Sequence, residues 1–216
     1  MSKVRSDLGV EKFYRIISKK FVNKIEHTSI TPNNLSWFSF FLIIVAIPFI
    51  IFSNSNYFNL ISFILINISL VMDCADGELA KKKRMQSQFG GHLDCTLDRL
   101  TDNIFILVIT ISNFLNEGSE IYLFFGLIFI GFRFCIDNVY FSMIVFLPNF
   151  KQDKINSGFL MNFIEYFIFT RTTMLFLGSL FILFNYQKEY LIIMSGYVLL
   201  YYFAILIYTY MKSFKD

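Results

Sequence analysis

The sequence predicts an all-α integral membrane protein, in which six transmembrane helices follow an N-terminal amphipathic surface helix. Of its 216 residues, 56% are hydrophobic and 19% aromatic, which is too apolar for a soluble domain of this length. The basic residues gather in short runs, so we expect no nucleic-acid partner. The cysteines lie in apolar segments without a CxxC pair, so we expect no disulfide among Cys74, Cys95 and Cys135.

Residues 1–27 are expected to form the amphipathic helix. Apolar side chains such as Val10, Phe13 and Ile17 recur at roughly helical spacing, and lysines and arginines lie between them. A basic face favours the anionic cytoplasmic leaflet, so we expect this helix on the cytosolic side. A solvated basic tail is the alternative.

Six apolar stretches follow, each near the ~20 residues that a helix needs to cross a bilayer. Thr31-Pro32-Asn33 precedes the first, and these residue types suit a helix start. The expected spans are 34–53, 58–80, 92–114, 121–147, 158–184 and 190–211. We expect one membrane domain over residues 1–216, with all six spans within 34–211 and the chain broken before the third span at Gly90-Gly91.

The charged loops predict the orientation. The run Lys81–Arg84 closes the second span, and lysines also follow the fourth and sixth spans, whereas the loop 113–120 has no Lys or Arg. Under the positive-inside rule, these features place both termini in the cytoplasm.

Four carboxylates fall within two spans that are otherwise apolar. Asp73 and Asp76 are separated by three residues on the second span, and Asp94 and Asp98 by four on the third, so each pair shares a helix face. Asp73 lies roughly 12 Å from the cytosolic end of the second span, and Asp98 lies about as far from the start of the third, so the acids sit at matching depth. We therefore expect antiparallel neighbours to bring all four together in a site that faces the cytosol.

Four adjacent carboxylates need cations to stay ionised. Oxygen ligands suit a hard ion such as Mg²⁺, with Mn²⁺ as the other candidate, and four of them suffice for two ions about 4 Å apart. Zinc is not expected, because the spacing of His92 from Cys74 and Cys95 matches no zinc pattern.

Small and basic residues follow the first acidic pair. Gly77 and Ala80 would let a ligand approach the helix backbone, Lys81 supplies positive charge for phosphates, and Ser87 adds a hydroxyl. Helix packing is the alternative role for Gly77 and Ala80.

This stretch resembles the signature of the CDP-alcohol phosphatidyltransferase family. The match covers every fixed position but one within Asp73-x2-Asp76-Gly77-x2-Ala80-Lys81-x8-Gly90-x3-Asp94-x3-Asp98. Lys81 stands where the family has Arg, and an ammonium cannot make the bidentate phosphate contact of a guanidinium. The six spans, the amphipathic leader and Thr31-Pro32-Asn33 also resemble this family.

The resemblance implies an enzyme of phospholipid or polyol-phosphate synthesis, which transfers a phosphatidyl-type group from a CDP-alcohol to an acceptor alcohol and releases CMP. Asp73, Asp76, Asp94 and Asp98 would bind two Mg²⁺ ions, and Asp98 would also be the catalytic base. The CDP-alcohol would be bound by Asn33, Ser36, Gly77, Ala80, Lys81 and Ser87. Other expected partners are membrane lipids and a second copy of the chain as a homodimer.

Residues 90–102 and the leader resemble the branch that uses inositol phosphate, although choline-, serine- and glycerophosphate-type acceptors stay open. Arg133 and Arg171, on the fourth and fifth spans, are candidates for the acceptor phosphate. The alternative is that they pair with Asp137 and Glu165. Arg99 and Asp102 are expected to pair with each other across one helical turn.

Two other functions compete with the transferase. One is a small membrane cation transporter or channel that uses the intramembrane acids, but it leaves Gly77, Ala80 and the basic run unexplained. The other is a family member that binds substrate without turnover, which the presence of all four acids argues against.

Overall fold

The computed structural model describes residues 10–53, 55–146 and 170–213. Helices make up nearly all of these ranges, and no strand occurs within them. The helices are α1 (Val10–Ile25), α2 (Pro32–Ile51), α3 (Asn56–Lys82), α4 (Gln88–Glu117), α5 (Ile121–Phe146), α8 (Arg171–Leu183) and α9 (Gln187–Ser213).

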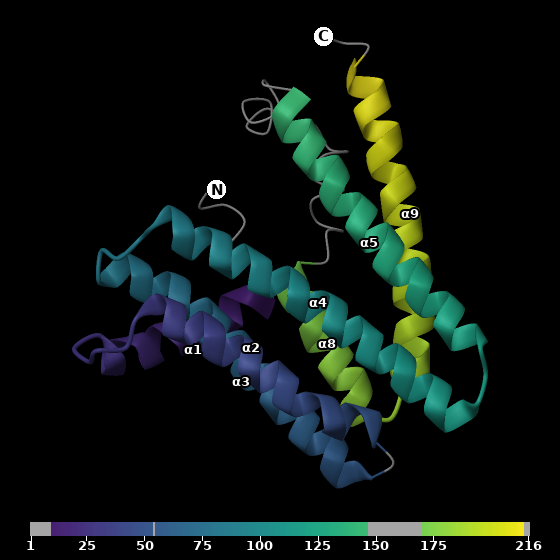
Figure 1. The fold of residues 1–216 in the computed structure, drawn as a ribbon, viewed down its shortest axis with the longest axis horizontal. Helices are drawn as coiled ribbons and strands as arrows, with labels where there is room; N and C mark the ends of the chain where they lie inside the picture. The colour runs from purple at the N-terminus through teal and green to yellow at the C-terminus, as the bar shows by residue number, and fades with distance from the viewer. Residues whose placement is uncertain (1–9, 54, 147–169, 214–216) are drawn as a thin grey trace.

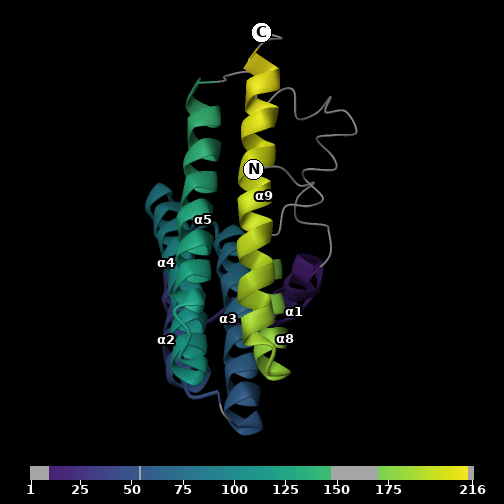
Figure 2. The ribbon, with the colours of Figure 1, turned by 90° about the vertical axis from the view of Figure 1, so that its right-hand side faces the viewer.

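The helices pack in two groups that share α4 and α8 (Figure 1). In the first group α2 packs against both α3 and α4, and in the second α5 runs beside α9. Figure 2 shows α5 and α9 side by side along much of their length. The shorter helix α8 contacts α3, α4 and α9, so it joins the two groups.

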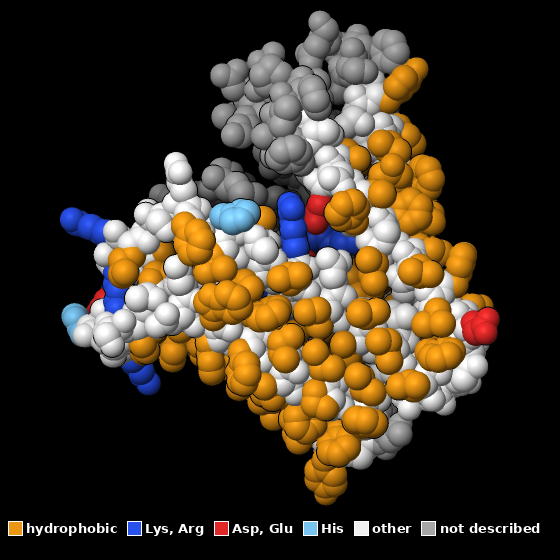
Figure 3. Space-filling view, in the orientation of Figure 1, with side chains coloured by type: hydrophobic (Ala, Val, Ile, Leu, Met, Phe, Trp, Pro, Cys, Tyr) orange, Lys and Arg blue, Asp and Glu red, His pale blue; other side chains and the backbone are white. Residues whose placement is uncertain are grey.

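Four of the described helices are long and apolar enough to cross a membrane, namely α2, α3, α5 and α9. Large apolar side chains are exposed along them, as in Figure 3, where hydrophobic side chains cover most of the lower and right-hand surface. An apolar exterior is what a lipid bilayer requires. The integral-membrane class is thus supported, and the count of six spans stays a prediction.

Two helix starts differ from the expectation. The helix expected over 158–184 is not continuous, because Thr170 has an extended backbone and its hydroxyl caps α8 at the Thr173 amide (3.3 Å). Residues 158–169 lie outside the described part of the chain. The expected break at Gly90-Gly91 is also wrong, since Ser87 caps α4 and the helix begins at Gln88.

Helix α1 lies within the predicted 1–27 segment and packs against α3 and α8. Its buried side chains are Tyr14, Ser18 and Val22. The Tyr14 hydroxyl donates a hydrogen bond to Asn67 Oδ1 of α3. Burial raises the pKa of this hydroxyl well above its ordinary value, so it stays protonated as a donor. The helix is therefore fixed to the bundle along one face.

Gly178 provides a stability prediction for the contact between α8 and α4. A Cβ at this position would lie 2.5 Å from Phe105 Cε1 and 3.1 Å from Tyr190 Cζ, and both rings are almost fully buried. We expect Gly178→Ala to lower the free energy of unfolding by about 1–3 kcal/mol, because the rings must move. The check is thermal unfolding of the purified protein in detergent.

The matched control is Gly196→Ala in α9, where an added Cβ meets no described atom within 4 Å. We expect it to be neutral or slightly stabilising, because alanine favours helix. Equal stability of the two variants would contradict the close packing at Gly178.

Candidate active site

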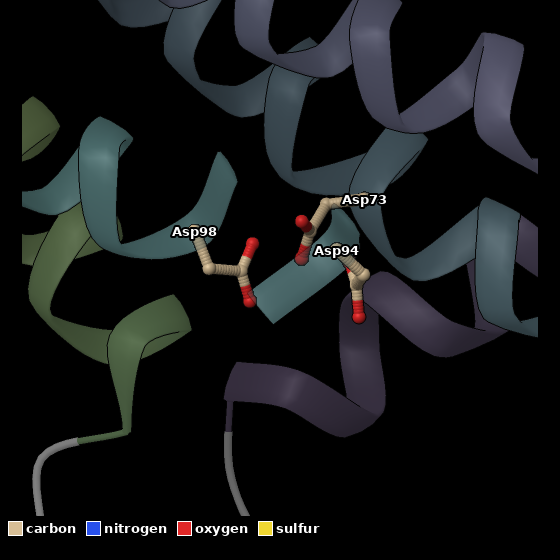
Figure 4. Close-up of side chains that lie close together, drawn as sticks. All are labelled: Asp73, Asp94 and Asp98. Carbon is tan, nitrogen blue, oxygen red and sulfur yellow. The ribbon is translucent and has the colours of Figure 1, made fainter. Parts of the chain in front are cut away.

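Three of the predicted carboxylates converge between α3 and α4. Asp73 comes from α3, Asp94 and Asp98 come from α4, and one carboxylate oxygen of each lies within 4.8 Å of the others. In Figure 4 the Asp73 and Asp98 carboxylates point toward one another, with Asp94 beside Asp73. We call these three residues the acid group. Each is partly exposed, so the group is accessible.

Asp76 lies one helical turn beyond Asp73 but is not one of the three that converge. It is only 6% exposed, and its Oδ2 accepts a hydrogen bond of 2.5 Å from Ser36 Oγ of α2. A buried carboxylate needs such a partner. Ser36, predicted to bind the CDP-alcohol, therefore contacts one of the predicted acids directly.

Arg171 lies among the acids. Its Nη1 is 2.8 Å from Asp73 Oδ1 and 2.8 Å from Asp98 Oδ1, and its Nε is 3.1 Å from Asp102 Oδ1. The side chain reaches this position from the first residue of α8. A buried guanidinium offsets the repulsion between neighbouring carboxylates. Glu165, its expected partner, lies outside the described residues.

Arg133 forms the expected ion pair with Asp137, with Nη1 3.3 Å from Oδ1. Its Nη2 is also 3.5 Å from Asp102 Oδ2. The expected pair of Arg99 with Asp102 is wrong, because among the described residues the ion pair of Arg99 is with Asp137, whose Oδ2 lies 3.9 Å from Arg99 Nε. Asp102 is buried and pairs with Arg133 and Arg171, whereas the Arg99 side chain is 60% exposed. In Figure 3 a small group of charged side chains is visible near the centre of the face, apart from the charged side chains at its left and right edges.

The residues predicted to bind a nucleotide lie near the basic end of α3. A Cβ at Gly77 would meet no described atom within 4 Å, so packing within the described chain does not require glycine there. A Cβ at Gly90 would lie 3.0 Å from Ser87 Oγ and 3.3 Å from Asn33 Oδ1, which places Asn33 beside the start of α4. Lys81 is exposed, with its Nζ 3.6 Å from Glu78 Oε1.

The acid group suits a hard divalent cation, since it offers only carboxylate oxygens from two rigid helices. In the described part of the chain, no cysteine or histidine joins a group of three or more metal-binding side chains. The three cysteines are free. The donor set therefore fits Mg²⁺ or Mn²⁺ better than zinc.

The model of the CDP-alcohol phosphatidyltransferase family matches residues 29–210, which is most of the chain and includes the acid group. The chain belongs to the CDP-alcohol phosphatidyltransferase family. This is a family of transferases, which agrees with the prediction of an enzyme. A 93-residue stretch is also 27% identical to an uncharacterized protein of Aquifex aeolicus (strain VF5) and covers 43% of this chain and 45% of that protein. The chain therefore matches less than half the length of that relative.

Asp102 is the functional candidate that the sequence reading missed. It continues the series Asp94, Asp98 at a spacing of four residues, so it lies on the same face of α4. That spacing was the available signal. The nearby Arg99 suggested a local ion pair instead.

Proposed function

We propose that the chain is a Mg²⁺-dependent CDP-alcohol phosphotransferase that moves a phosphatidyl-type group to an acceptor alcohol and releases CMP. The observation that carries this proposal is the convergence of three signature carboxylates from two helices within 4.8 Å. Membership of the family supports the same reaction class.

Asp73, Asp94 and Asp98, with Asp76 one turn away, are the residues that would hold two divalent ions. When bound, such ions neutralise charge on the diphosphate and on the departing CMP. Asp98 accepts the proton of the acceptor hydroxyl, whose oxygen attacks the phosphorus that carries the donor alcohol. The bond from that phosphorus to the CMP oxygen breaks. Asp98 suits the base role because its side chain is 31% exposed and can meet an incoming hydroxyl.

The donor nucleotide would bind beside the basic end of α3. The open space at Gly77 and the neighbouring Ala80 leave room for it, and the exposed Lys81 supplies positive charge. Asn33 and Ser87, which both lie beside Gly90, would form one edge of this region, and Ser36 donates a hydrogen bond to Asp76. The exposed apolar flanks of α2 and α3 would let the lipid tail of a CDP-lipid remain in the membrane.

The proposed acceptor is inositol phosphate, bound through its phosphate by Arg133 and Arg171. Arg171 reaches two residues of the acid group, and Arg133 shares the carboxylate of Asp102 with it. Two guanidiniums beside a proposed metal site suit a second phosphate. We also propose cytosolic termini, a site that faces the cytosol, and a homodimer.

The test is CMP release by membranes that contain the chain, given CDP-diacylglycerol, Mg²⁺ and a panel of alcohols that includes inositol phosphate. We expect one acceptor to give a lipid product and EDTA to stop the reaction, because the acid group would lose its cations. A cation channel would release no CMP, and its monovalent flux would survive EDTA. That combination would contradict the transferase.

A further inference from the structure

Asp102 is the one described carboxylate that pairs with both Arg133 and Arg171. It is 4% exposed; its Oδ1 is 3.1 Å from Arg171 Nε, and its Oδ2 is 3.5 Å from Arg133 Nη2. Each oxygen thus accepts from a different guanidinium. Because the three residues come from α4, α8 and α5, this carboxylate ties three helices together one turn from Asp98.

Arg171 connects Asp102 to the acid group. A guanidinium is a rigid plane, so holding its Nε at Asp102 restricts where Nη1 can lie. That nitrogen is 2.8 Å from both Asp73 Oδ1 and Asp98 Oδ1, which are oxygens that a divalent cation would use. The position of one guanidinium relative to the proposed metal ligands is therefore set by a carboxylate that is not itself a member of the acid group.

We propose that Asp102 is a positioning residue. Its carboxylate binds the Arg171 guanidinium, so that Arg171 divides its ion pairing among Asp102, Asp73 and Asp98 and does not pair with Asp73 and Asp98 alone. This proposal rests on the proposed function. Without the Asp102 charge, those two aspartates are the remaining described carboxylate partners of Arg171. The arginine then competes more strongly with a divalent cation for the same oxygens. Asp102 thereby acts on metal affinity through Arg171.

The test is a double-mutant cycle with Asp102→Asn and Arg171→Gln, read as Mn²⁺ affinity by electron paramagnetic resonance on the purified full chain. We expect Asp102→Asn to weaken Mn²⁺ binding by about tenfold, a typical cost for a supporting residue of a metal site. Arg171→Gln should then raise the Mn²⁺ affinity in both backgrounds. The factor of this increase should be about ten times larger in the Asp102→Asn background than in the wild type.

The matched control is Asp137→Asn, which removes the other carboxylate partner of Arg133 but has no contact with Arg171. We expect its Mn²⁺ affinity to stay within about twofold of wild type. Equal effects of Arg171→Gln in both backgrounds, within about twofold, would overturn the proposal, because a purely additive charge effect would then suffice.

If Asp102→Asn is not recovered as a folded protein, Asp102→Glu replaces it in the cycle. Glutamate keeps the charge but moves the carboxylate by one methylene, and we expect a loss of about threefold or more that Arg171→Gln reverses. Unchanged affinity would overturn the proposal. A wild type that binds Mn²⁺ and releases CMP, but gives an additive cycle, contradicts only the role of Asp102. A wild type that does neither contradicts the proposed function as well.

Discussion

The variant Asp98→Asn is expected to lose CMP release almost completely while the protein stays folded. Asparagine keeps the size of the side chain but can neither accept the proton of an acceptor hydroxyl nor offer a charged oxygen to a cation. A general base alone contributes about 10²–10⁴-fold to a rate. We therefore expect CMP release with CDP-diacylglycerol, Mg²⁺ and the acceptor found in the alcohol panel to fall by about a thousandfold or more.

Asp137→Asn is a suitable control for this measurement. The two side chains are exposed to nearly the same degree, 31% for Asp98 and 29% for Asp137, and each carboxylate pairs with an arginine. Asp137 is not part of the acid group. Full activity of Asp98→Asn would contradict the assignment of Asp98 as the base. An equal loss of CMP release in both variants would indicate that the substitutions disrupt the structure of the protein.

The convergence of the acid group could be predicted because it depends in part on local geometry. Spacings of three and four residues place each pair of aspartates on one helix face. The two faces then meet because α3 and α4 both pack against α2, and not through direct packing of one on the other. The capping of α2 by Thr31 was predictable for the same reason, since the cap and its first turn are adjacent in sequence. The helix face and the cap are local features, whereas the meeting of the two faces depends on how the helices pack.

The contacts of Asp102 with Arg133 and Arg171 could not be derived in this way. Asp102 is 31 residues from Arg133 and 69 residues from Arg171, and both contacts exist only because α5 and α8 pack beside α4. The sequence offered a local partner, Arg99, and that pairing proved wrong because Asp102 pairs with Arg133 and Arg171, whereas Arg99 lies near Asp137. The start of α8 at Arg171 was likewise hidden within an apolar stretch, although Thr170 and Thr173 form its cap.

Arg171→Ala is expected to lower the stability of the protein more than the loss of any exposed charge. The side chain is 14% exposed and pairs with three carboxylates, Asp73, Asp98 and Asp102. Removing one partner of a buried ion pair leaves the remaining charge uncompensated and costs about 3–5 kcal/mol. Thermal unfolding in detergent measures the effect. The control is Arg99→Ala, with a 60% exposed side chain and one distant carboxylate contact, which should cost less than about 1 kcal/mol.

Divalent cations should restore part of the stability that Arg171→Ala loses. With the guanidinium gone, the acid group keeps its charge and gains a stronger attraction for Mg²⁺, and a ligand that binds the folded state stabilises it. We expect Mg²⁺ to raise the unfolding temperature of Arg171→Ala by more than that of the wild type. A variant as stable as Arg99→Ala would show that the three ion pairs contribute little. An unstable variant that Mg²⁺ does not rescue would instead argue that the acid group is not a cation site.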